Sequence, residues 1–166
     1  MRTHAEAALE WFASWNRIDR DAFLALLAPG FVAKGVMAPQ GVDGETIWKV
    51  MVAFRETFHD QHWEPGRWLV SDRDLVVCEV FESGTFAGPW PDPGRKIAPT
   101  NRPYVSDAVM LFRFDPDGLI VENQSWYDSV DWFHQIGVDP NVAAPPGEVP
   151  DVSAIALAGT AGEPLA

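Results

Sequence analysis

Apolar positions in the first third of the chain recur at helical spacing. A capping-box pair, Thr3 and Glu6, precedes alanine and aromatic positions three or four residues apart, which predicts a helix over residues 4–16. A second, shorter apolar run predicts a helix over 19–28 that stops at a Pro-Gly pair. A third helix is predicted over 43–58, with an aspartate as its N-cap and a broad apolar face.

Beyond residue 60 the pattern becomes that of strands. Residues 68–70, 75–81, 104–114 and 119–127 are rich in β-branched and aromatic side chains and are separated by turn-forming residues. They predict four strands of an antiparallel sheet. One or two further helical turns are predicted over 130–137.

Three helices followed by strands indicate an α+β domain, a cone in which the helices cover one face of a strongly curved antiparallel sheet. The length of 166 residues supports one such domain, placed at 1–137. Residues 138–166 are rich in proline, alanine and glycine and carry acidic but no basic side chains, which favours an extended arm. Its apolar residues are possible anchors on the domain or a partner: Val149, Val152, Ile155 and Leu157.

Composition and charge narrow the class of protein. The hydrophobic share is 47% and the charged share 22%, as in soluble globular proteins. A formal net charge of −12 disfavours nucleic acids and anionic membranes as partners. The N-terminal segment has no signal-peptide pattern and no apolar run reaches the ~20 residues of a membrane span, so a cytoplasmic protein is expected. Cys78 is the single cysteine, which excludes an internal disulfide and a zinc site built from cysteines.

Several short motifs, in this order, resemble the SnoaL-like polyketide cyclase (ester cyclase) family. They are Trp15-Asn16 with Asp19 and Phe23, Phe58-His59-Asp60-Gln61-His62, Gly84-Thr85-Phe86-Ala87-Gly88, Phe112-Arg113-Phe114 before Asp117-Gly118-Leu119-Ile120, and Trp126-Tyr127-Asp128 before Gln135-Ile136-Gly137. The matches span roughly residues 9 to 137. The resemblance implies the nuclear transport factor 2-like cone fold and ring closure by aldol chemistry without metal or cofactor. It places the catalytic aspartate at Asp128.

Departures from the family pattern bear on the chemistry. Phe86 stands where many members have histidine, and His59 where many have proline. By comparison with the related ketosteroid isomerases, the base position falls near Gly35 and the oxyanion-hole acid near Met110, which disfavours steroid isomerisation. Epoxide hydrolases of this fold use an Asp-Arg-Asp set, and the chain has no arginine between Glu82 and Asp128 that fits it.

Three residues are candidates for acid/base catalysis: Asp128, Glu82 and His62. Asp128 ends an aromatic strand, where loss of hydration raises the pKa of a carboxyl; the alternative is that it caps a short helix over 129–135. Glu82 is in phase with Cys78 and Val80, and either faces the cavity as a second acid or lies exposed on the outer face. His62 is a candidate hydrogen-bond donor or proton carrier.

Eight tryptophans in one small domain favour a pocket for flat, apolar or polycyclic ligands. Trp90, between two prolines, is a candidate lid. Both phases of the strand over 119–127 carry polar side chains, so either set can line the cavity. The predicted substrate-binding residues are Trp11, Trp15, Trp90, Tyr104, Met110, Trp126 and Tyr127.

The function expected from these features is cofactor-independent acid/base catalysis, an aldol-type cyclisation, isomerisation or dehydration, on a polyketide-like or terpenoid-like carbonyl compound. No metal or cofactor is expected. A non-catalytic ligand-binding module and an epoxide hydrolase of the same fold remain alternatives. An assembly protein, its cone plugged by its own side chains, is a further one. A homodimer is expected, because helices on one face of a curved sheet leave the other face to be covered.

Overall fold

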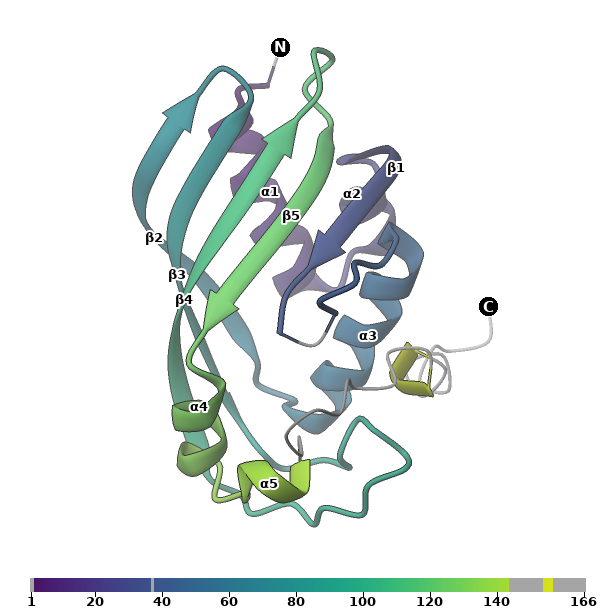
Figure 1. Ribbon diagram of the computed structural model, residues 1–166, viewed down its shortest axis with the longest axis vertical. Helices are drawn as coiled ribbons and strands as arrows, with labels where there is room; N and C mark the ends of the chain where they lie inside the picture. The colour runs from purple at the N-terminus through teal and green to yellow at the C-terminus, as the bar shows by residue number, and fades with distance from the viewer. Residues whose placement is uncertain (1, 37, 144–153, 157–166) are drawn as a thin grey trace.

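Helices and strands separate into two layers in the computed structural model, which describes residues 2–36, 38–143 and 154–156 (Figure 1). The first layer contains α1 (His4–Arg17), α2 (Arg20–Leu24) and α3 (Gly44–Thr57). The second is a curved sheet of β1 (Leu27–Lys34), β2 (His62–Asp72), β3 (Leu75–Thr85), β4 (Pro103–Phe114) and β5 (Ile120–Tyr127). Two short helices follow β5, α4 (Ser129–Gln135) and α5 (Pro140–Ala143). No described helix is long and apolar enough to cross a membrane.

The three predicted N-terminal helices are confirmed, and their caps explain where they begin. Thr3 and Glu6 form the capping box of α1, with both reciprocal hydrogen bonds present. Asp19 caps α2 and Asp43 caps α3, each accepting from the backbone N–H three residues on. The second helix was predicted to reach residue 28, but it ends at Leu24.

The strand order is β1-β5-β4-β3-β2, and every pair is antiparallel except β1 and β5. β1 was not predicted: residues 27–28 were assigned to the second helix and the rest to a loop. The Pro29-Gly30 pair, typical of a helix end, lies inside this strand instead. Gly30 has φ of 82°, and the pairing register with β5 shifts between Leu27 and Val32, so the strand tolerates the pair as an irregularity.

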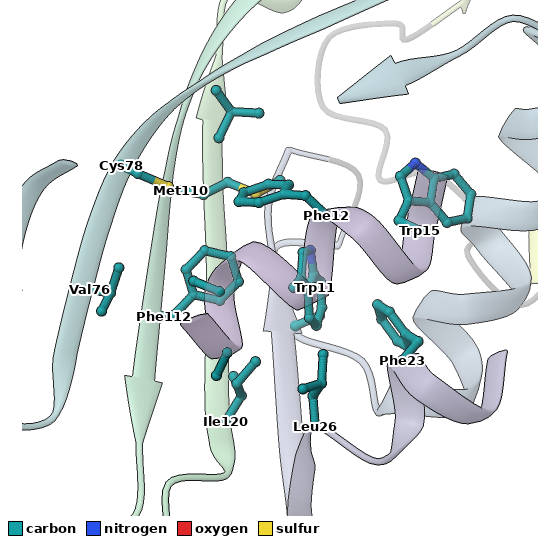
Figure 2. Packing of buried hydrophobic residues seen from close by; sticks show 14 of the residues in the cluster. Trp11, Phe12, Trp15, Phe23, Leu26, Val76, Cys78, Met110, Phe112 and Ile120 are labelled. Atoms are coloured by element: carbon teal, nitrogen blue, oxygen red, sulfur yellow. The ribbon is translucent and has the colours of Figure 1, made fainter. Parts of the chain in front are cut away.

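Aromatic rings from α1 fill the space between the helices and the concave face of the sheet. Figure 2 shows Trp11 and Phe12 projecting from α1 toward Phe112 of β4. Their ring centroids lie 5.6 and 5.8 Å from that of Phe112, both in edge-on arrangements. Val76 and Cys78 of β3, both fully buried, complete this part of the core.

A second aromatic cluster closes the end of the cone where α4 packs against β4. Trp90 belongs to it, with its ring centroid 5.6 Å from that of Phe86 and 6.2 Å from that of Trp132. Thr57 anchors the same loop to the end of α3, because its hydroxyl donates to the Pro89 carbonyl at 2.6 Å. The structure therefore places Trp90 as a packed side chain of this cluster.

Packed structure continues past the predicted domain end at residue 137. Val138 and Ala143 are buried in the second cluster, although they were assigned to the extended arm. Ile155 is buried against Val50 and Ala53 of α3, and residues 154–156 are helical, not extended. The other predicted anchors, Val149, Val152 and Leu157, lie outside the described residues.

Gly88 is the position in this loop that tolerates no side chain. A Cβ there would lie 1.8 Å from the Glu56 carbonyl oxygen. The Gly88 N–H donates to the Thr57 carbonyl at 2.9 Å, which anchors the loop at the end of α3. We expect Gly88→Ala to lower the free energy of unfolding by about 1 to 3 kcal/mol, measured by urea denaturation. Gly94→Ala is the matched control, since its Cβ meets only the flexible Asp92 side chain. Equal stability of both variants would contradict this anchoring.

Candidate active site

A pocket lies between α1, α3 and the concave face of the sheet, and most of its wall is apolar. Its cavity volume is about 130 Å³. A single water needs roughly 10 to 15 Å³ by the same measure, so the cavity has room for a ring-sized molecule. Val36 is the exposed member of the lining. The apolar wall includes Trp11, Trp15, Ile47, Val50, Met51, Phe54, Trp63, Met110 and Trp132.

Glu82 is the only carboxylate in the described lining of this pocket. Its Oε1 atom accepts two hydrogen bonds, from Gln61 Nε2 at 2.6 Å and from the Tyr104 hydroxyl at 2.5 Å. Its Oε2 atom accepts none from the described residues. Burial raises the pKa of the Glu82 carboxyl above its ordinary value, and the hydrogen bonds from Tyr104 and Gln61 oppose that rise only in part.

The alternation of β3 turns Glu82 inward. Val76, Cys78 and Val80 share its phase and are fully buried. Glu79 is in the opposite phase, where its carboxylate accepts two hydrogen bonds from the Arg67 guanidinium, at 2.6 and 2.8 Å. The two glutamates of this strand therefore lie on opposite faces of the sheet. Of the two positions that the sequence allowed for Glu82, the structure has the one that faces the cavity.

The turn after α3 brings Gln61 to the carboxylate. Asp60 accepts from both the backbone N–H and the hydroxyl of Thr85, at 2.6 and 2.7 Å, which ties this turn to the end of β3. Arg55 of α3 donates to the Gln61 carbonyl oxygen. These contacts fix the Gln61 backbone, so its side-chain amide is held in place to donate to Glu82.

Two tyrosines complete the polar part of the site. Burial and the neighbouring Glu82 charge both raise the pKa of Tyr104 and of Tyr127, with burial the larger cause. Both phenols therefore stay protonated near neutral pH, and the Tyr104 hydroxyl donates to Glu82. Tyr104 lies behind the carboxylate, whereas Tyr127 lines the pocket.

Four of the predicted substrate-binding residues line the pocket: Trp11, Trp15, Met110 and Tyr127. Tyr104 is not in the lining, but its hydroxyl donates to Glu82, which is. Trp126 does not: its side chain is 46% exposed on the outer face of β5. The inward phase of β5 is the set Asn123, Ser125 and Tyr127. This settles the alternative that the sequence left open for that strand.

Asp128 is not brought to the pocket. It is exposed, and its carboxylate accepts from the backbone N–H groups of Val130 and Asp131, both at 3.0 Å, as the N-cap of α4. The expected loss of hydration is therefore absent, and the capping alternative describes its position. His62 is also exposed and outside the lining, because Trp63 takes the inward phase at the start of β2.

Sequence reasoning missed several lining residues. Gln61 lies within one of the family-like motifs, but nothing in the sequence showed that its amide contacts Glu82. Lys34, whose Nζ lies 3.3 Å from Glu122 Oε1, belongs to β1, and finding it required the β1–β5 pairing. The neighbouring Gly35, the position near which the isomerase comparison placed the base, also lines the pocket. Trp132, from α4, separates the pocket from the second cluster.

The described part of the chain offers neither a clustered metal site nor an activated thiol. No group of three or more histidine, cysteine, aspartate or glutamate side chains there is placed to hold a metal ion. Cys78 lies mid-sheet, and burial raises the pKa of its thiol to about 12. That thiol remains protonated at neutral pH.

Residues 8–123 match the family model described as SnoaL-like domain. No curated protein matches the chain significantly. Among solved structures, IdmH from Streptomyces antibioticus, described as a candidate polyketide cyclase, is 23% identical with a TM-score of 0.70, covering 81% of this chain and 99% of its own. A candidate SnoaL-like polyketide cyclase from Jannaschia sp. CCS1 is 24% identical with a TM-score of 0.68, covering 86% and 93%.

AclR from Streptomyces galilaeus, described as a candidate hydroxylase, is 22% identical with a TM-score of 0.67, covering 81% of this chain and 95% of its own. The described activities of these three similar proteins differ. At identities of this size, the likeness establishes a common fold, and the chemistry has to be argued from the side chains of this pocket.

The raised pKa of Glu82 predicts a specific pH dependence. We expect its carboxyl to titrate above an ordinary glutamate in a ¹³C NMR titration, and Tyr104→Phe to move that titration higher still, because one donor to the carboxylate is lost. Glu79 is the internal reference, since its hydrogen bonds with Arg67 lower the pKa of that carboxyl. A Glu82 titration at or below that of Glu79 would contradict the assignment.

The same shift affects stability. A glutamate whose pKa is raised by folding favours the folded state below its unfolded pKa, and this contribution is lost as pH rises through the folded pKa. Glu82→Gln should therefore be less sensitive to pH over that interval and more stable than the parent above it. Chemical denaturation at a series of pH values measures the difference.

Proposed function

Because the chain belongs to the SnoaL-like domain family, which has the nuclear transport factor 2-like cone fold, we propose that it is a cofactor-independent acid/base enzyme acting on an apolar polyketide-like or terpenoid-like carbonyl compound. Glu82 carries this proposal. It is a carboxylate with a raised pKa in an aromatic pocket, and one of its oxygens is left without a hydrogen bond by the described residues.

The reaction that suits this geometry begins with proton transfer from carbon. Glu82 Oε2 takes a proton from the carbon next to a ligand carbonyl, and the C–H electron pair becomes that of an enolate. In an aldol-type cyclisation the enolate carbon then attacks a second carbonyl of the same molecule, forming a C–C bond. Glu82 returns its proton to the new alkoxide, so the step balances without an oxidant or a reductant. A carboxyl with a raised pKa is a stronger base than an ordinary one.

Glu82 is preferred over the two other predicted acids and bases. Asp128 and His62 are exposed and lie outside the lining, while Glu82 contacts the cavity. The epoxide-hydrolase alternative is disfavoured because the described lining holds one carboxylate and no arginine. A non-catalytic binding module would use the same pocket, with Glu82 as an anchor for a ligand hydroxyl.

Exchange of carbon-bound hydrogen tests the proposal without knowledge of the natural substrate. Enolisable cyclic ketones such as 2-tetralone are incubated in D₂O with catalytic amounts of protein, and NMR follows deuterium entry next to the carbonyl. We expect the parent to accelerate exchange and Glu82→Gln to lose about 10²- to 10⁴-fold of that acceleration, because glutamine cannot take the proton.

Glu79→Gln is the matched control for this experiment, being the same change on the outer face of the same strand. Asp128→Asn is the second control, and both variants should exchange at the parent rate. Exchange lost in Asp128→Asn but kept in Glu82→Gln would return the catalytic role to Asp128. A parent that binds ketones without accelerating exchange would support the binding module.

We also propose that the chain forms a homodimer through the outer face of its sheet. The helices cover the opposite face, and the outer face carries large apolar side chains that stay exposed: Phe81 at 42%, Val105 at 59% and Trp126 at 46%. They come from β3, β4 and β5, which are neighbours in the sheet, so the apolar surface extends across three strands. A second copy of the chain is a suitable cover for such a surface.

Trp126→Glu tests the dimer, since it replaces a large apolar side chain of this surface with a charge. We expect the parent to sediment as a dimer at micromolar concentration and the variant to sediment as a monomer. The variant should bind ketones like the parent, because Trp126 lies outside the pocket. A monomeric parent would refute the proposed interface.

A further inference from the structure

Three polar side-chain atoms in the described part of the chain are buried without a hydrogen-bond partner. They are Trp15 Nε1, Trp63 Nε1 and Gln61 Oε1. All three side chains line the pocket of Glu82. Buried polar groups are nearly always paired in folded proteins, because an unpaired one has lost its hydration without compensation. Three unpaired groups around one cavity point to a ligand that pairs them.

Strand pairing places Trp63 beside Glu82, and a side-chain contact links Trp63 to the end of α1 that carries Trp15. Trp63 and Glu82 are directly paired residues of the antiparallel strands β2 and β3. The Asn16 side chain binds the Trp63 backbone at both polar groups: its Nδ2 donates to the Trp63 carbonyl at 2.8 Å, and its Oδ1 accepts from the Trp63 N–H at 3.0 Å. Asn16 follows Trp15 in α1, so this bidentate contact fixes the end of α1 that carries Trp15 against the start of β2.

The chemistry of the three atoms defines what the ligand must offer. An indole N–H only donates, so Trp15 and Trp63 require acceptor atoms. Gln61 Nε2 donates to Glu82, which leaves its Oε1 as an acceptor that requires a donor. The Glu82 charge and the net charge of −12 disfavour an anionic group at this position. The acceptors are therefore neutral oxygens, and the donor is a hydroxyl or an enol.

We propose that the indole N–H groups of Trp15 and Trp63 bind the carbonyl oxygens at the oxygenated end of the substrate, and that Gln61 Oε1 accepts from a hydroxyl or enol on the same end. The substrate class is thus a hydroxylated or enolised ketone, such as a 1,3-dicarbonyl compound. This inference rests on the proposed function for one step: the carbon next to the bound carbonyl lies at Glu82 Oε2.

The indole contacts have a catalytic consequence. As Glu82 removes the proton, negative charge moves onto the carbonyl oxygen, and donors already placed there stabilise the enolate more than the ketone. Because Trp15 and Trp63 are fixed by packing and by the Asn16 contact, little reorganisation accompanies this change. The two indoles then act as the oxyanion-binding groups of the site.

A pair of probes separates hydrogen bonding from packing. 1-Tetralone and tetralin share a two-ring frame and differ in the carbonyl, and ligand-observed NMR titration gives the Kd of each. Trp15 and Trp63 are replaced singly by benzothienylalanine, which keeps the two-ring shape and removes the N–H. Trp15→Phe and Trp63→Phe form a second series. Trp48 is the control position, because it is buried and packs edge-on against Trp15 but does not line the pocket.

We expect each replacement at position 15 or 63 to weaken 1-tetralone binding about two- to tenfold while tetralin binding changes less, as loss of one hydrogen bond requires. The change at position 48 should leave the ratio of the two Kd values unaltered. Equal weakening of both probes, or unchanged 1-tetralone binding, would overturn the proposal. The proposal would also be overturned if the parent protein did not bind 1-tetralone, because the indole N–H groups would then not be binding a ketone oxygen.

The ratio of the two Kd values tests the ligand class, and deuterium exchange tests the catalysis. The two measurements therefore keep this inference separate from the proposed function. If deuterium exchange fails in the parent but the ratio of Kd values still depends on the indole N–H groups, the ligand class stands and the enzyme function falls. If exchange depends on Glu82 but the ratio ignores positions 15 and 63, the enzyme function stands and the role of the indoles falls.

Discussion

A layer of aromatic rings between the helices and the concave face of the sheet determines where the pocket lies. Trp11 and Phe12 of α1 meet Phe112 edge-on, so α1 is held about one ring's width from the strands. A second ring cluster around Phe58 and Trp132 fills the opposite end of the cone. Between them the inward face of the sheet carries the polar side chains of Glu82, Asn123 and Ser125. The cavity lies at these positions, and rings of both helices and strands form the wall around it.

The charge of Glu82 is tolerated there because its surroundings are arranged around it. A buried carboxylate is costly unless hydrogen bonds compensate, and Gln61 and Tyr104 supply two. Both bind the same oxygen, which leaves the other one directed to whatever occupies the cavity. The contacts that hold Gln61, from Arg55 and from the Asp60–Thr85 pair, lie outside the cavity and so can be kept whatever ligand is bound.

Local sequence signals predicted the elements whose determinants are local. Capping residues and helical periodicity gave α1 and α3 to within about a residue, and the twofold alternation placed Glu82 in phase with the buried Val80. Asp128 illustrates the limit of such reasoning. It follows Tyr127, a pocket residue, but the strand alternation and the start of α4 turn it to solvent, and a motif match does not contain that information. Gln61 and the unpaired indoles depend on contacts between segments far apart in the chain.

β1 shows the same limit and has a consequence for how the molecule assembles. Among the described strands it pairs with β5 alone, about 90 residues away in the chain, and the pairing is parallel, so no hairpin can bring the two together. Contacts that close such long loops form after local ones, because their entropic cost precedes their gain. The antiparallel strands β2 to β5 can pair in sequence order, and we expect β1 to join last. On this order, the part of the pocket wall that Lys34 and Gly35 contribute forms after the strands that carry Glu82 and Trp63 have paired.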